Sequence, residues 1–210
     1  MTTLAVVLGL AIFLVIANGL VSWQIERRIE TSLETNLGFP VEVDLSGWPV
    51  VPRLLLSSIP QAQVKARNVA VPGIGASVGL VQFTLENVSW KKQRRGPLDP
   101  PIRAESIRFK MEVTEESLEE LFVGQQGVGD VRLANGRARL TGVGGLTTDF
   151  DVAASGGSVV LSPELPVVDF EIYLPIDPLV PGRTRVERVL VEEGRLILTG
   201  STEDLGITGY

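Results

Sequence analysis

The chain begins with an almost unbroken apolar stretch. Residues 4–23 hold 16 apolar side chains in 20 positions, and no charged residue comes before Glu26. Twenty helical residues are about 30 Å long, which matches the hydrocarbon thickness of a bilayer. Trp23 stands where an interfacial aromatic side chain would lie, with two arginines shortly after it. The pattern predicts a transmembrane anchor or a signal segment over residues 1–25.

This segment allows two interpretations, a cleaved secretory signal or an uncleaved anchor. A signal normally begins with positive charges and ends at a cleavage site of small residues. No charge precedes the span, and Ala17-Asn18-Gly19 is a poor cleavage site, so we favour the anchor. Arg27 and Arg28 directly after the span favour a cytoplasmic position for the rest of the chain. Only two side chains carry that argument, and glutamates lie beside them.

Apolar residues then recur every four positions, which predicts that the helix continues beyond the span as far as Leu37. The stripe consists of Val21, Ile25, Ile29, Leu33 and Leu37. We expect the opposite face to be polar, and it carries Arg27, Glu30, Glu34 and Asn36. Gly38 and Pro40 end the helix. Such a stripe usually faces a core, so we expect it to support a sheet.

The rest of the chain is mostly strand. Four segments carry apolar residues at their first, third, sixth and eighth positions, with Thr184 as the one exception, and a polar pair between. These segments are residues 64–71, 83–90, 102–109 and 184–191. A flat strand with one buried face keeps a period of two, so the slip predicts a bulge or a sharp twist. We place these irregularities at Asn68, Asn87, Ser106 and Arg188. The strands should therefore be curved.

Tight turns and a second helix complete the predicted fold. VRLANGRARLTG (131–142) and VLVEEGRLILTG (189–200) share six residues in place and read as hairpins that turn at Asn-Gly and Glu-Gly. Thr114 begins a helix over residues 115–122. The predicted fold class is α+β, a long curved antiparallel sheet wrapped on an N-terminal helix, with one domain over residues 26–210.

Composition excludes several kinds of chemistry. The 210 residues include 19 Lys and Arg, 25 Asp and Glu, and neither His nor Cys, so the net charge is −6. Triads with histidine, thiolate nucleophiles and metal sites built on His or Cys are thereby excluded. An acidic chain is a poor nucleic-acid binder. We expect no enzyme activity, no catalytic residue, no metal and no cofactor.

Carboxylate pairs are the remaining candidates for chemistry. Glu42 and Asp44, and likewise Asp149 and Asp151, are spaced to share one strand face, as in a hydrolase or a calcium site. Solvated outer faces of half-buried strands are the simpler interpretation, which we favour.

One basic run stands out in this acidic chain. Trp90 is followed by Lys91, Lys92, Arg94 and Arg95, in a stretch that joins two predicted strands. A solvated loop tip and a contact with anionic lipid headgroups are equally good interpretations.

The segment VEVDLSGWPVVPRLLLSSIPQAQVKARNVAV (41–71) resembles the opening of the LmeA family of bacterial phospholipid-binding proteins. The family pattern there is a strand, a Gly-aromatic-Pro break, a short leucine-rich helix and another strand. GRARLTG (136–142) and YLPIDPLVPGRTRVERVLVEEGRLILTG (173–200) resemble its closing strands. The resemblance covers most of residues 25–205. It implies an envelope protein that binds phospholipid, with a curved sheet around a long helix as in tubular lipid-binding domains, and it offers no catalytic signature.

The resemblance directs attention to the most apolar part of its first segment. Residues 50–59 read as a short helix between Pro and Gly breaks, and we place a ligand entrance there. Its residues are Trp48, Leu54, Leu55, Leu56 and Ile59, with Arg53 as partner for a headgroup. A lid and an ordinary core helix remain open alternatives. Ile25, Ile29 and Leu33 would form the floor of the groove.

The resulting hypothesis is non-catalytic phospholipid binding or lipid handling through an apolar groove. The expected partners are phospholipid and membrane, not nucleic acid. We follow the resemblance in expecting a membrane-anchored or secreted protein with its domain on the extracytoplasmic side. An envelope scaffold that docks another protein is the alternative, and a hydrolase built on Asp149 and Asp151 ranks third.

Overall fold

The computed structural model of the chain describes residues 2–45, 58–70, 77–90, 102–126, 128–142, 144–155, 158–164, 172–174 and 184–202. The first elements are α1 (Thr2–Leu37), β1 (Glu42–Asp44), β2 (Ser58–Ala70), β3 (Ser77–Trp90), β4 (Ile102–Arg103) and β5 (Ser106–Thr114). They are followed by α3 (Glu115–Gln126), β6 (Val128–Ala134), β7 (Arg137–Gly142), β8 (Thr147–Ser155), β9 (Ser158–Pro163), β10 (Ile172–Leu174), β11 (Thr184–Glu192) and β12 (Arg195–Thr202).

The described strands form two sheets. The first has the strand order β1-β2-β3-β5-β12-β11, with β4 paired to β3, and the second has the order β10-β9-β8-β7-β6. Neighbours in the second sheet are antiparallel, as are the pairs β3–β4, β5–β12 and β11–β12. The predicted α+β class with antiparallel sheet is confirmed.

The chain divides into two compact units. The first comprises Met1–Val64, Leu85–Glu105 and Ile207–Tyr210, and the second comprises Lys65–Thr84 and Ser106–Gly206. α1 and β1 belong to the first unit, whereas α3 and the whole second sheet belong to the second. The predicted boundary between the anchor and the domain, at residues 25 and 26, falls inside α1 and stays a prediction.

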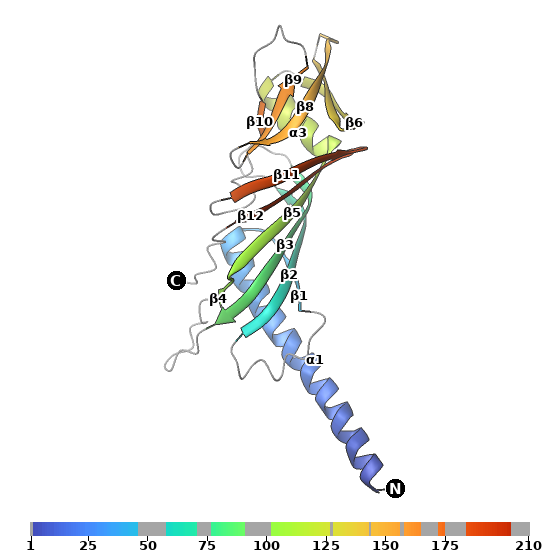
Figure 1. Cartoon of the computed structure of the whole chain (residues 1–210), viewed down its shortest axis with the longest axis vertical. Coiled ribbons are helices and arrows are strands. Elements are labelled where there is room, and N and C mark those ends of the chain that lie inside the picture. Colours follow the sequence, from blue (N-terminus) through green and yellow to red (C-terminus); the bar gives the residue numbers. More distant parts are fainter. Residues whose placement is uncertain are drawn as a thin grey trace. The chain divides into compact units, whose positions relative to one another are not determined.

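The helix α1 is continuous over 36 residues and ends where the sequence predicts. Gly38 has a φ of 77°, and its N–H donates to the carbonyl of Glu34 at 2.9 Å, a left-handed residue that closes the last turn. Figure 1 shows α1 beside β1, with its N-terminal half running on past the strands of the same unit. Ile29 and Leu33 of the predicted stripe are buried, at 2% and 0% exposure.

The predicted C-terminal end of the helix over residues 50–59 is wrong. The short helix predicted over residues 50–59 would include Ser58 and Ile59, but β2 begins at Ser58. Pro60 explains the difference, because the residue before a proline is pushed away from helical geometry and Pro cannot donate a helical hydrogen bond. Ile59 is buried in the strand instead. Residues 50–57 lie outside the described residues.

The irregularities predicted in four strands are present. Asn68 and Asn87 have left-handed φ values of 50° and 51°, and the register of β11 against β12 shifts between Val186 and Arg188. The fourth strand is interrupted between β4 and β5, directly before Ser106. A hydrogen bond links the irregularity in β3 to the interruption between β4 and β5, since Asn87 Nδ2 donates to Glu105 Oε2 at 2.6 Å. The period-two slip therefore marked local bends, as bulges produce.

Asn68→Ala should lower the free energy of unfolding by about 1 kcal/mol, because alanine tolerates a left-handed φ less well than asparagine does. Asn68→Gly should be nearly neutral, since glycine adopts this conformation freely. Urea-induced unfolding of both variants beside the wild type measures the difference. Equal stability of the alanine and glycine variants would contradict the left-handed conformation.

The second unit confirms the predicted hairpins and helix. Asn135 and Gly136, with φ values of 54° and 80°, form the two-residue turn between β6 and β7, and Glu193 and Gly194 join β11 to β12. Thr114 caps α3, since its hydroxyl oxygen accepts from the N–H of Ser117 at 3.3 Å.

Candidate functional site

The apolar side of α1 forms part of the interior of the first unit. Ile29 and Leu33 are buried, Ile25 is half-buried, and β1, which α1 contacts, buries Val43. Ile59 of β2 is also buried. Of the predicted floor residues, the structure therefore places Ile29 and Leu33 in the apolar interior of this unit, with Ile25 half-buried.

The other predicted site residues are not placed. Trp48, Arg53, Leu54, Leu55, Leu56, Lys91, Lys92, Arg94 and Arg95 lie outside the described residues. Trp90 ends β3, and its side chain is also outside them. The predicted entrance and the predicted basic contact stay predictions.

Residues 15–23 of α1 have the opposite character. Val15, Ile16, Leu20 and Trp23 are 56% to 73% exposed. The Arg27 guanidinium lies over the Trp23 ring, 5.9 Å from its centroid, a distance typical of a cation–π contact. Among the residues whose side chains the structure describes, no helix combines the length and the apolar character needed to cross a membrane.

A row of glutamates joins α1 to β1, and we call Glu26, Glu30 and Glu34 the glutamate row. Their carboxylates accept hydrogen bonds from the backbone N–H groups of Leu45, Val43 and Val41 at 3.2, 3.2 and 3.3 Å, respectively. Among the described strands, β1 lies at the edge of its sheet, so no described strand pairs with its outer N–H groups. The carboxylates thus take the place of strand carbonyls.

The geometry of helix and strand explains this fit. Four helical residues rise about 6 Å, and two strand residues rise about 6.6 Å, so successive glutamates meet alternate strand residues. The sequence predicts Glu30 and Glu34 on the polar face of the helix, but it does not predict their hydrogen bonds to the strand. The signal that could have found them is the four-residue spacing of acids directly before an edge strand with period two.

The second unit uses the same arrangement. Glu115 and Glu119 of α3 accept from the N–H groups of Leu133 and Val131 at 2.6 and 3.1 Å. β6 is likewise an edge strand, of the second sheet. Each helix therefore protects the exposed edge of the strand that follows it in the chain.

A comparison with protein families decides the assignment. Residues 14–201 match the model of the LmeA-like phospholipid-binding family. The chain belongs to this family. Comparisons with curated proteins and with solved structures gave no match.

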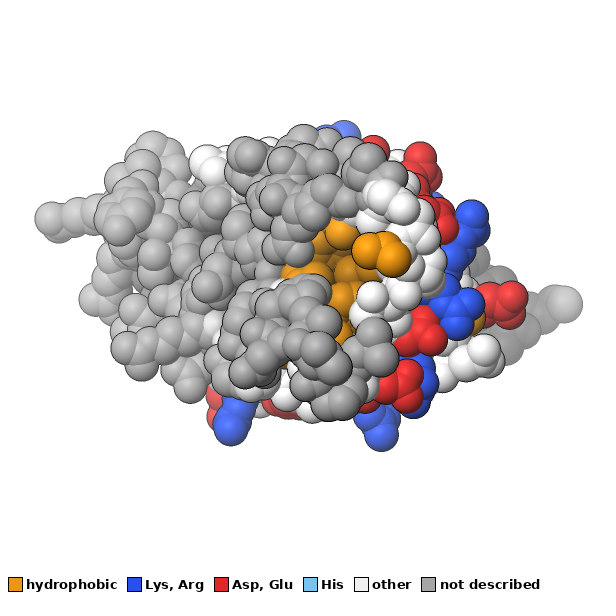
Figure 2. Space-filling view, turned by 90° about the horizontal axis from the view of Figure 1, so that it is seen from above, with side chains coloured by type: hydrophobic (Ala, Val, Ile, Leu, Met, Phe, Trp, Pro, Cys, Tyr) orange, Lys and Arg blue, Asp and Glu red, His pale blue; other side chains and the backbone are white. Residues whose placement is uncertain are grey.

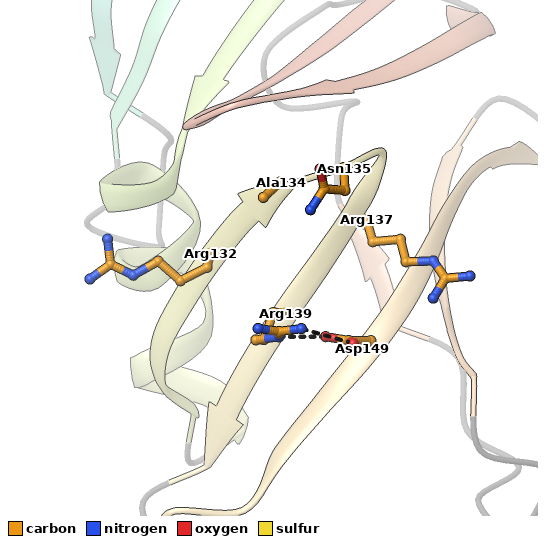
Figure 3. A pocket seen from close by; sticks show the side chains of 6 residues that line it. All are labelled: Arg132, Ala134, Asn135, Arg137, Arg139 and Asp149. Carbon is orange, nitrogen blue, oxygen red and sulfur yellow. Dashed lines mark hydrogen bonds and ion pairs between the residues drawn. The ribbon is translucent and has the colours of Figure 1, made fainter.

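Membership of a phospholipid-binding family makes any arginine-lined hollow of interest. One such hollow, of about 360 Å³, lies on the second sheet and is lined by Arg132, Ala134, Asn135, Arg137, Arg139 and Asp149. Arg132 and Arg139 are direct partners across β6 and β7. Figure 3 shows the guanidinium groups of Arg132 and Arg137 pointing away from Arg139, to opposite sides.

The hollow is a poor phosphate site for a family member because its arginines are already paired. Arg132 lies near Glu115 and Asp130, at 3.6 and 3.4 Å. Arg137 lies near Asp151 and Glu164, at 3.5 and 2.8 Å. Arg139 donates twice to Asp149, at 2.7 and 3.1 Å. Five carboxylates thus surround three arginines. Figure 2 shows acidic and basic side chains intermixed along one side of the molecule.

The ion pair of Arg139 with Asp149 affects the ionisation of Asp149, one of the two predicted carboxylates. The hydrogen bond from Arg139 lowers the pKa of Asp149, and Asp149 raises the pKa of Arg139. The ion pair favours the ionised form of Asp149, which does not suit the general acid of a carboxylate pair. Within the described residues, no group of three or more carboxylates could hold a metal ion.

Proposed function

We propose that the chain binds a phospholipid without chemistry and places an acyl chain against the apolar side of α1. The observation that carries this proposal is the division of one uninterrupted helix into two kinds of apolar surface. The middle of the helix exposes Leu20 and Trp23, whereas the turns that follow bury Ile29 and Leu33. The first kind suits a bilayer and the second suits a groove floor.

Apolar burial supplies enough free energy for this role. Each buried methylene contributes about 0.8 kcal/mol, so ten of them contribute about 8 kcal/mol. That free energy is measured from water, so an apolar groove could offset the cost of taking an acyl chain out of the bilayer without any catalytic or charged group.

We place the protein at the cell envelope, anchored by α1, with its domain on the extracytoplasmic side. The apolar stretch of residues 4–23 supports the anchor, and Trp23 with Arg27 supports an interfacial position for the next turn. The extracytoplasmic side follows what the sequence resemblance implies, and we prefer it to the positive-inside argument from two arginines.

Photo-crosslinking tests the proposal in the full chain. The chain is reconstituted in vesicles that contain a phospholipid with a diazirine in one acyl chain, and cross-linked peptides are identified by mass spectrometry. Residues 4–23 should be cross-linked by bulk lipid. Peptides that contain Leu33 and Val43 should be cross-linked as well, because the groove holds an acyl chain there.

The distribution of cross-links separates the functions considered. Labelling confined to residues 4–23, in protein whose circular dichroism shows folded sheet, would contradict lipid binding by the domain. A protein recovered in place of lipid at the Leu33 peptide would favour the scaffold function instead.

A further inference from the structure

We infer that phospholipid enters laterally between α1 and β1, and we call this boundary the seam. The hydrogen bonds of the glutamate row keep the seam closed. The inference rests on the proposed function and adds the place of entrance and the residues that control it.

The hydrogen bonds across the seam differ in kind from those between the paired strands β11–β12, β12–β5 and β6–β7. Those pairs are held by ladders of backbone hydrogen bonds, which separate only when the sheet unfolds. Across the seam, the hydrogen bonds run from the backbone of β1 to side chains of the glutamate row, at 3.2 to 3.3 Å. Side chains can change rotamer while the backbone of both elements stays intact. The seam can therefore open without loss of secondary structure.

Opening the seam would uncover the proposed groove floor. Each glutamate of the row follows directly after a residue of the apolar stripe, as in Ile25-Glu26, Ile29-Glu30 and Leu33-Glu34. Successive helical residues point about 100° apart, so the row runs along the margin of the stripe. When the glutamate row releases β1, the part of α1 that carries Ile29 and Leu33 is no longer held to that strand.

The seam also begins at the place where lipid would arrive. Glu26 is three residues after Trp23, about 4.5 Å along the helix axis, and adjoins Arg27, which contacts the Trp23 ring. With Trp23 at the membrane interface, the end of the seam at Glu26 and Leu45 lies at headgroup depth. A lipid could then slide from the bilayer along a continuous apolar stripe without crossing water.

The second unit provides a matched control. Glu119 accepts from Val131 at 3.1 Å, much as Glu30 accepts from Val43 at 3.2 Å, in the same helix and edge-strand arrangement. Each substitution to alanine removes one carboxylate bond from one edge strand. Only Glu30 belongs to the seam.

The experiment measures lipid exchange in the full chain. Vesicles that carry the protein and the diazirine phospholipid are mixed with an excess of unlabelled vesicles, and cross-linking at the Leu33 peptide is followed over time. Glu30→Ala should speed the loss of this cross-link about fivefold, and Glu119→Ala should change it less than twofold. Glu30→Gln keeps an acceptor oxygen and should lie between Glu30→Ala and the wild type.

Hydrogen–deuterium exchange gives a second readout that needs no variant. Phospholipid vesicles should speed amide exchange in residues 41–45 of the wild type, relative to residues 131–133, because passage of lipid opens the seam. Unchanged or slower exchange in residues 41–45, or equal cross-linking kinetics for Glu30→Ala and Glu119→Ala, would overturn the inference. Absence of the Leu33 cross-link in the wild type would instead overturn the proposed function.

Discussion

Leu33→Ala should lower the free energy of unfolding by about 3 kcal/mol. Leu33 is fully buried on the side of α1 that faces the interior of the first unit. Truncation of a buried leucine loses the transfer free energy of the removed carbons and leaves a cavity that the neighbours fill only partly. The proposed acyl chain would lose a contact as well, so cross-linking at this peptide should also fall. Urea-induced unfolding of the full chain in one detergent, followed by circular dichroism, measures the change.

Leu20→Ala is the matched control for Leu33→Ala. It is the same chemical change on the same helix, but Leu20 is 63% exposed in the structure. Its effect on the free energy of unfolding should stay within about 0.5 kcal/mol. If the two variants were equally stable, α1 would not be packed on the sheet, and the proposed groove would have no floor.

The apolar pattern predicted the parts of the fold that depend on one face of one element. The four-residue repeat of Ile25, Ile29 and Leu33 predicted which side of α1 is buried, because burial follows helical periodicity. The slip in period two similarly predicted the bends at Asn68 and Asn87, since a residue that faces neither side must leave the regular strand.

Pairing between distant elements was harder to predict. The hydrogen bonds of the glutamate row were not predicted, because a helical wheel does not show the edge strand beside it. The three bonds to β1 appear only once β1 is known to end its sheet. Local chemistry likewise overrode the apolar pattern at Ile59, where the proline that follows favours a strand.

Gly200→Ala should also lower the free energy of unfolding by about 3 kcal/mol. Gly200 lies in β12, paired with Val186 of β11 on one side and Phe109 of β5 on the other. A Cβ there would overlap the carbonyl oxygen of Arg185 and lie 2.7 Å from the Phe109 ring. The carbonyl is backbone next to the irregularity in β11, so it cannot move without disturbing the register. Overpacking of this kind typically costs up to about 3 kcal/mol.

Gly144→Ala and a double variant show whether this close approach is the cause. Gly144 lies in the same unit, and a methyl group added there would meet no atom within 4 Å, so its substitution should stay within about 0.5 kcal/mol of the wild type. Phe109→Leu in the Gly200→Ala background shortens the ring side chain but leaves the Arg185 carbonyl in place, so it should restore little stability. Full recovery in the double variant would assign the clash to the ring alone, and a stable Gly200→Ala would show that β11 does not pass so close to β12.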